Sequence, residues 1–268
     1  MTKVGLSSSG AQRLLLGIGL ALLMTPMAQA KTMEEVTACM RSNIPKSVQI
    51  KEFELTATDR SGGIRELRGR LYGVREEQDK LRAMMKISAP TDMAGAAYLL
   101  REKEGGDEKY IYVPALNKVR RVTGADAEGT LWGTDISYSD LRQLNNAFTE
   151  GQSTLEGEGD LAGRKVYIVR VKPDAGAGHS RFSEVKLWVD QQTCVGLRAE
   201  FTEGTTVRKR FDVDPKSLRQ AGKVWYAGEA LMSDLGLGSK TRIRVVGLSS
   251  DVTLSGRYFN PSTFYVGG

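Results

Sequence analysis

The chain has 268 residues, a formal net charge of +6 and 40% hydrophobic residues, which is enough apolar material for one sizeable core. The positive charge is mild and spread along the chain, so it does not indicate a nucleic-acid-binding surface. A single histidine and two cysteines offer no recognisable metal-binding or catalytic spacing, and we expect neither a bound metal nor a cofactor.

The first 30 residues have the features of an export signal. Two basic residues precede an apolar run from Leu14 to Met24, and Ala28 to Ala30 form a small-x-small cleavage site. The apolar run is shorter than the roughly 20 residues that a membrane-spanning helix needs. We therefore predict a signal peptide over residues 1–30, cleavage after Ala30, and one exported domain over residues 31–268.

The predicted elements of that domain begin with a short helix. Thr32 and Glu35 have the spacing of a capping box, and apolar residues recur on one helical face as far as Met40. Pro45 ends this pattern. The mature chain is therefore expected to start with a short amphipathic helix.

After this helix the apolar residues alternate with polar ones, which predicts β-strands. Consecutive amphipathic strands joined by short polar turns favour an antiparallel sheet, because parallel strands need crossover helices. One face of such a sheet is apolar and has to be covered. Two folds fit this periodicity equally well: a half-open barrel with an apolar hollow, or a two-sheet sandwich. The alternating segments are residues 53–57, 67–71, 81–87, 167–171, 185–189, 195–201 and 243–245.

A second short helix is predicted near residue 139. Ser137 lies three residues before Asp140, which gives an N-cap and an acidic first turn, and Leu141, Leu144 and Phe148 share one face. The two helices are the only candidates in the sequence for covering the apolar face of the sheet.

The two cysteines, Cys39 and Cys194, allow one disulfide in an oxidising compartment. Such a bridge would close a very long loop, worth on the order of 4 to 5 kcal/mol in the chain-entropy model. Two buried thiols that never meet fit the sequence equally well.

The sequence shows no catalytic machinery. His179 lies in a loop rich in glycine and alanine, where a solvated side chain is expected. A Gly-x-Ser-x-Gly nucleophile motif is absent, and the glycine-rich residues 235–241 lie between two strand signals, which is typical of a hairpin turn and not of a phosphate-binding loop. We therefore do not expect an enzyme, and a lipid hydrolase is the least favoured function.

Three stretches, "APTDMAGAAYLL", "KYIYVPALNKVRRV" and "WGTDISYSDL", resemble the outer-membrane lipoprotein-sorting proteins of the LolA-like superfamily. Thr134, Ile136 and the position of Trp132 depart from the family pattern. The residues that match it are Pro90, Gly95, Tyr110, Tyr112, Pro114, Arg120, Arg121, Gly133, Asp135, Ser137, Tyr138, Asp140 and Leu141.

This resemblance implies a mainly β fold: a strongly curved antiparallel sheet forming an unclosed half barrel, with a few short helices covering an apolar cavity. It implies a periplasmic carrier that binds lipid, lipoprotein acyl chains or another apolar ligand for transport toward the outer membrane, with only transient membrane contact. The alternative is a lipid-sensing accessory protein that docks on an inner-membrane exporter of the resistance-nodulation-division (RND) type. No nucleic-acid partner is implied.

The stretch from residue 109 to residue 141 is expected to form one strand and the mouth of the cavity. Our hypothesis is that Arg120 or Arg121 pairs with Asp135 or Asp140 and, near Tyr138, fastens the intervening loop across the mouth. An anchored loop with no ligand role is equally compatible. The strand face that lines the cavity is left open. The candidate lining residues are Met85, Tyr98, Leu100, Tyr110, Tyr112, Leu131, Trp132, Leu187 and Val189.

Overall fold

The computed structural model describes residues 1–2, 5, 31–76, 79–104, 106–123, 126, 129–149, 151–173, 181–250 and 252–266. The chain divides into two units, Met1–Ala30 and Lys31–Gly268, and all the described helices and strands belong to the second unit. None of the helices in the described parts of the chain is long and apolar enough to cross a membrane.

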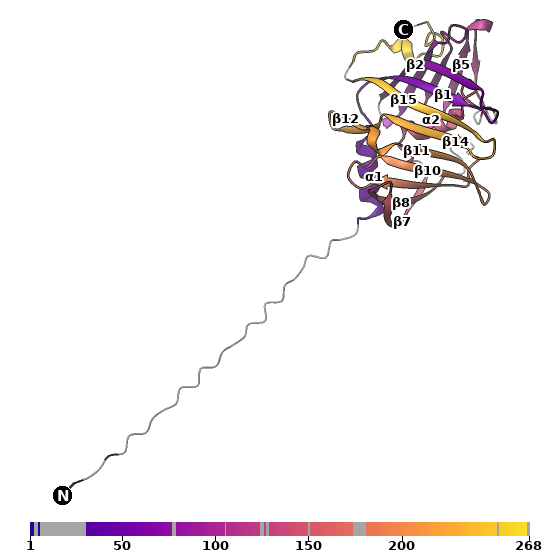
Figure 1. Ribbon diagram of the computed structural model, residues 1–268. Helices are drawn as coiled ribbons and strands as arrows, with labels where there is room; N and C mark the ends of the chain where they lie inside the picture. Colours follow the sequence, from indigo (N-terminus) through magenta and orange to yellow (C-terminus); the bar gives the residue numbers. More distant parts are fainter. Residues whose placement is uncertain are drawn as a thin grey trace. The chain divides into compact units, whose positions relative to one another are not determined.

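The second unit is dominated by β-strands (Figure 1). They are β1 (Gln49–Thr58), β2 (Ile64–Arg75), β3 (Leu81–Ala89), β4 (Ala97–Arg101), β5 (Glu108–Val113), β6 (Lys118–Arg121), β7 (Gln152–Leu161), β8 (Arg164–Lys172), β9 (Glu184–Asp190), β10 (Gly196–Glu203), β11 (Thr206–Val213), β12 (Leu218–Ala221), β13 (Val224–Ala227), β14 (Glu229–Asp234) and β15 (Ser239–Ser250).

Thirteen of these strands form one antiparallel sheet with the order β6-β5-β4-β3-β2-β1-β15-β14-β11-β10-β9-β8-β7. Strands β6 and β7 are its two edges, so the sheet does not close into a barrel. Strands β12 and β13 form a separate two-stranded hairpin. The mainly β, unclosed sheet that the resemblance implied is thus confirmed. The sandwich alternative is excluded, because a single large sheet contains both halves of the chain.

Both predicted helices are present. Helix α1 (Met33–Ser42) has the capping box of Thr32 and Glu35, with the Glu35 backbone N–H donating to the Thr32 hydroxyl at 3.3 Å. Helix α2 (Tyr138–Asn145) has Ser137 as its N-cap. It ends before Phe148, because the two residues 147 and 148 have left-handed φ angles of 49° and 58°, which stop a helix.

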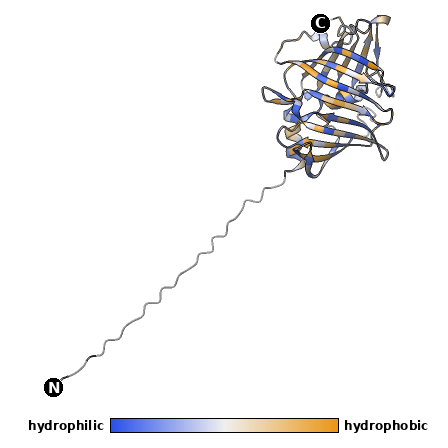
Figure 2. Cartoon of the chain, in the orientation of Figure 1, coloured by the Kyte–Doolittle hydropathy of each residue, from blue (hydrophilic) through white to orange (hydrophobic). Residues whose placement is uncertain are grey.

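The alternation along the strands divides the sheet into two faces (Figure 2). The inner face, as we call it, carries the larger core, which includes Phe53, Leu55, Met85 and Leu187 and the apolar side of α2. The outer face carries a smaller apolar cluster around Met84 and Leu99.

The C-terminal residues 254–265 cover the small cluster of the outer face. Phe264 is fully buried there, and Tyr265 stacks on Tyr112 with ring centroids 4.1 Å apart. In Figure 1 this segment lies at the end of the sheet that carries β2 and β5. The outer face is therefore closed at that end by the chain itself.

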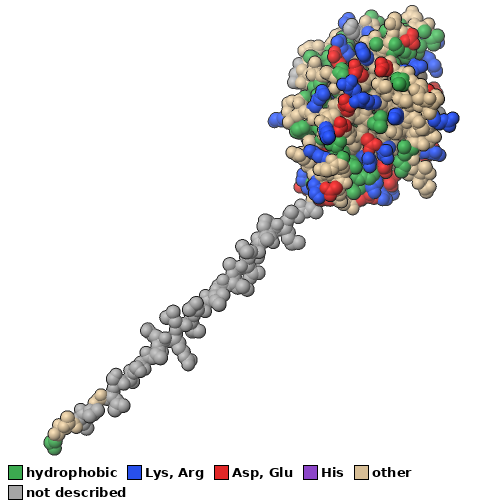
Figure 3. Space-filling view, in the orientation of Figure 1, with side chains coloured by type: hydrophobic (Ala, Val, Ile, Leu, Met, Phe, Trp, Pro, Cys, Tyr) green, Lys and Arg blue, Asp and Glu red, His purple; other side chains and the backbone are tan. Residues whose placement is uncertain are grey.

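Elsewhere the outer face is charged. The carboxylate of Glu54 on β1 forms salt bridges with Arg68 of β2 at 3.4 Å and with Arg244 of β15 at 3.1 Å. Arg244 also forms a salt bridge with Glu229 of β14 at 3.2 Å. Figure 3 shows acidic and basic side chains interspersed on the visible face. Such exposed pairs add little stability individually, but they keep this side of the sheet hydrated.

Candidate functional site

The inner face of the sheet encloses a cavity of about 220 Å³. Its floor is formed by side chains of β1, β2, β3, β11, β14 and β15, among them Phe53, Leu55 and Met85. Helix α2 and the residues that follow it, the β9–β10 turn and strand β13 supply the rest of the lining. The cavity therefore lies where the inner face is covered by short elements and not by a second sheet.

The lining of this cavity is largely aliphatic and aromatic. Its polar members are Asn43, Lys51, Asn145 and Tyr226, and none of its described residues is acidic or a histidine. Each methylene group withdrawn from water contributes roughly 0.8 kcal/mol, so such a cavity binds an apolar chain without directed polar chemistry. The described residues also contain no group of three or more side chains arranged to hold a metal ion.

Helix α2 is held over the inner face by a buried ion pair. The ammonium group of Lys209 on β11 contacts the carboxylate of Asp140, and the two side chains are 3% and 2% exposed. The same carboxylate accepts the backbone N–H of Ser137 at 2.8 Å. Asp140 therefore caps the helix and anchors it to the sheet through one group.

The loop before α2 is anchored to the start of β15. The hydroxyl of Thr241 accepts the backbone N–H of Asp135 at 2.8 Å and donates to the Asp135 carboxylate at 2.7 Å. The Ser239 hydroxyl donates to the same carboxylate. These bonds position Ile136, the next residue, in the cavity lining.

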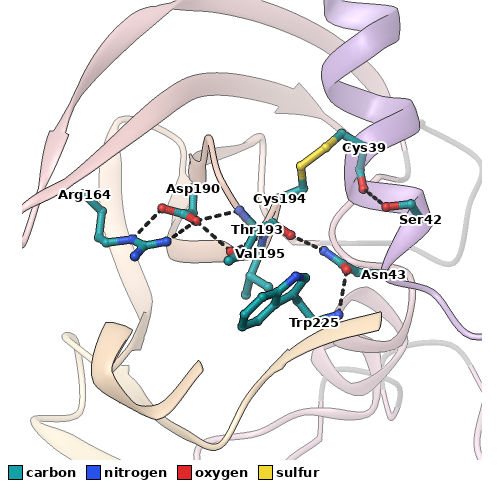
Figure 4. Close-up of a disulfide and its surroundings, with 9 residues drawn as sticks. All are labelled: Cys39, Ser42, Asn43, Arg164, Asp190, Thr193, Cys194, Val195 and Trp225. Carbon is teal, nitrogen blue, oxygen red and sulfur yellow. Dashed lines mark hydrogen bonds and ion pairs between the residues drawn. A yellow bond between two sulfur atoms is a disulfide. The ribbon is translucent and has the colours of Figure 1, made fainter. Parts of the chain in front are cut away.

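Asn43, which also lines the cavity, connects the end of α1 to the β9–β10 turn and to β13 (Figure 4). Its side-chain amide donates to the backbone oxygen of Thr193 at 2.7 Å, and its side-chain oxygen accepts the backbone N–H of Trp225 at 2.9 Å. Next to it, Cys39 of α1 and Cys194 of the β9–β10 turn form a disulfide, with Cα atoms 5.7 Å apart. Of the two alternatives that the sequence left open, the structure has the bridge.

The β9–β10 turn is itself fixed by Asp190. Its buried carboxylate accepts two hydrogen bonds from Arg164 at 2.8 and 2.7 Å, and the backbone N–H of Thr193 at 2.8 Å. Burial alone would raise the pKa of Asp190, but the hydrogen bonds from Arg164 and Thr193 hold it below its ordinary value. The stability that this carboxylate contributes is therefore present above about pH 4 and is lost as the pH falls through the lowered pKa.

The predicted lining residues separate into three groups. Met85 lines the cavity. Tyr98, Leu100, Leu131, Leu187 and Val189 are buried in the inner core, where Trp132 packs against them, but they lie outside the cavity lining.

Tyr110 and Tyr112 form the third group, and their predicted place in the cavity is wrong. The register pairs them with Leu99 and Ala97 of β4, so they pack in the small cluster of the outer face. The residue between them, Ile111, pairs with Tyr98 and faces the inner core.

The predicted ion pair across the mouth is also wrong. Arg120 and Arg121 lie exposed on the edge strand β6, whereas Asp135 and Asp140 are buried against β15 and β11. Both aspartates do anchor their segments, but with partners that are distant in the sequence. Tyr138, the other expected anchor, packs its ring against Tyr98 at 4.8 Å. His179 lies outside the described residues.

Sequence reasoning missed the polar lining residue Lys51 and the β12–β13 hairpin. Lys51 was detectable, because it has the same period-two phase as Phe53 and Leu55 and therefore shares their face. The approach of Trp225 to Asn43, 182 residues away along the chain, left no local signal.

Comparison with known proteins places the chain in a family. A family model described as "-like: Uncharacterized protein" matches residues 79–264, which is more than half of the chain. The chain belongs to this family. No curated protein matches it.

Solved structures similar to this family member share its fold. A DUF1329 family protein from Desulfovibrio piger is 23% identical with a TM-score of 0.79, and the match covers 85% of this chain and 95% of that one. A putative outer membrane lipoprotein-sorting protein domain from Vibrio parahaemolyticus is 20% identical with a TM-score of 0.78, covering 87% and 98%. A LolA superfamily protein from Nitrosomonas europaea is 14% identical with a TM-score of 0.68, covering 86% and 98%. The expected LolA-like fold is confirmed.

Proposed function

We propose that the protein is a periplasmic carrier that holds a lipid, a lipoprotein acyl chain or another apolar ligand in the cavity of its inner face, for transfer toward the outer membrane. The observation that carries the proposal is the cavity itself: about 220 Å³ of space lined mainly by apolar side chains in a LolA-like fold. Protein interiors are close-packed and hold few voids larger than a water molecule, so an apolar space of this size is unusual.

The size of the cavity bears on its cargo. It exceeds the roughly 150 Å³ of an engineered apolar cavity that binds benzene, and it falls short of the roughly 300 Å³ at which pockets for drug-sized ligands begin. In this conformation it accommodates part of an acyl chain. A longer chain requires displacement of the elements that cover the cavity, namely α2 and strand β13.

Two features support an exported protein. The Cys39–Cys194 disulfide suits an oxidising compartment, and residues 1–30 have the composition of a cleavable signal peptide. We also infer that the protein acts by binding and not by catalysis, because the described cavity lining is largely aliphatic and aromatic.

Organic extraction of the protein purified from its native compartment, followed by mass spectrometry, tests the carrier function. We expect one apolar ligand per protein molecule. An empty protein that turns over an ester substrate would contradict the proposal. Stoichiometric co-purification with an inner-membrane RND-type permease would instead favour the lipid-sensing accessory role over free transport.

Filling the cavity should weaken ligand binding without unfolding the protein. Ala230 on β14 lines the cavity, and Ala230→Phe places a large ring in that space. We expect acyl-chain affinity, measured by calorimetry, to fall by about tenfold or more, and the free energy of unfolding to change by less than about 1.5 kcal/mol. The control is Ala115→Phe at an exposed position of the 3-10 turn Pro114–Leu116. Equal affinity of Ala230→Phe and the control would show that the ligand binds elsewhere.

A further inference from the structure

A second, smaller space adjoins the apolar cavity. It has a volume of about 70 Å³ and shares with the larger cavity the lining residues Asn43, Lys51, Leu71, Leu144, Asn145 and Ala147. Its other lining residues include Gln49 and Arg75. We call this space the polar compartment, because two cationic side chains line it.

Lys51 stands at the junction of the two spaces. It extends from the inner face of β1, where its cross-strand neighbours are Leu71 and Leu248. Burial lowers the pKa of Lys51 below its ordinary value. Within the described residues its ammonium group has neither a hydrogen-bond nor an ion-pair partner, and no described acidic residue lines either space.

Arg75, at the end of β2, provides a second hydrogen-bond donor that has no partner in the described part of the chain. Its side chain is only 7% exposed, and its terminal nitrogens reach the backbone oxygen of Asp79 at 2.7 Å and the side chain of Asn146. The carboxylate of Asp79 is 3.8 Å from the guanidinium and is largely exposed. The Arg75 Nε is buried and has no hydrogen-bond partner among the described residues.

We propose that the polar compartment binds the anionic head group of an amphiphile whose chain occupies the apolar cavity, with Lys51 as the main cationic contact and Arg75 as the second. This inference rests on the proposed carrier function and specifies its ligand class. A charged group withdrawn from water is costly unless it is paired, and the side chain of Arg75 is almost fully withdrawn and that of Lys51 partly so. The carboxylate or phosphate of a ligand supplies the missing partner and gains a charge-assisted hydrogen bond.

The head group thereby also fixes the orientation of the ligand. The compartment is much smaller than the apolar cavity, so a compact group such as a carboxylate or a single phosphate fits there and a chain does not. The chain then extends past Phe53 and Leu55 of β1. Specificity comes from the polar end of the ligand and most of the affinity from its apolar part.

Calorimetric titration of the delipidated protein with decanoate, decyl phosphate and decanol tests this assignment. We expect wild type to bind at least one of the two anions more tightly than decanol, and the tighter anion identifies the head group. Lys51→Met should weaken binding of that anion by about 10- to 100-fold and should affect decanol binding much less. Lys51→Arg keeps the charge and should retain most of the anion affinity.

Lys165→Met is the matched control, because it removes a lysine that is 72% exposed on β8 and leaves both spaces intact. It should bind all three compounds like wild type. If Lys51→Met still binds decanol, the variant is folded. If it does not fold, the assignment is tested by the wild-type protein alone, which should bind an anion more tightly than decanol.

The outcomes separate this inference from the carrier function. Equal binding of decanol and both anions by wild type, or unchanged anion binding by Lys51→Met, would overturn the head-group assignment and leave the carrier function standing. If wild type binds none of the three compounds, both proposals fail.

Discussion

Replacing Cys39 and Cys194 by alanine is expected to lower the free energy of unfolding by about 5 kcal/mol. The disulfide spans 155 residues of sequence, and in the chain-entropy model a bridge that closes so long a loop lowers the entropy of the unfolded chain by an amount worth about 5 kcal/mol. It also fastens α1 to the β9–β10 turn, beside the contacts that Asn43 makes with Thr193 and Trp225. The cavity wall should therefore loosen at this end.

Urea unfolding of wild type and the double alanine variant measures this loss. Wild type treated with a reductant should unfold at the same urea concentration as the variant, and the reductant should not affect the variant. Coincident unfolding curves of oxidised wild type and the variant would show that the bridge contributes nothing. A lower acyl-chain affinity of the variant in native buffer would show that the cavity depends on this wall.

Replacing Lys209 by methionine is expected to lower the free energy of unfolding by about 3 to 5 kcal/mol. The substitution leaves the Asp140 carboxylate 2% exposed with no other cation paired to it among the described residues, and an uncompensated buried charge is strongly destabilising. The loss should be concentrated at α2, because Asp140 both caps this helix and ties it to β11.

The double variant Asp140→Asn, Lys209→Met separates the lost pair from the unpaired charge. An asparagine oxygen still accepts the backbone N–H of Ser137, and no charge remains buried. We expect the double variant to be more stable than Lys209→Met alone in the same urea titration. A double variant that is less stable than Lys209→Met would mean that the unpaired Asp140 carboxylate is not the cause of the loss and that its charge still stabilises the start of α2.

The amino-acid sequence alone predicted the elements whose causes are local. The capping box at Thr32 and the N-cap at Ser137 placed both helix starts, because their hydrogen bonds span three residues. The alternation in residues 53–57 and 81–87 predicted β1 and β3, because a strand turns successive side chains to opposite faces. The family motifs between residues 90 and 141 added the fold.

Only the tertiary structure decided which partners these elements have. The register of β5 against β4 sends Tyr110 and Tyr112 to the outer face, and a shift of one residue would have reversed them. Asp140 meets Lys209 across 69 residues, and not the nearby basic pair, because β11 passes beneath α2 while β6 lies at the sheet edge. Lys51 and Arg75 lie on the adjacent strands β1 and β2, but residues of α2 and of the segment after α1 complete the compartment that they line, and no local pattern encodes where those segments lie on the sheet.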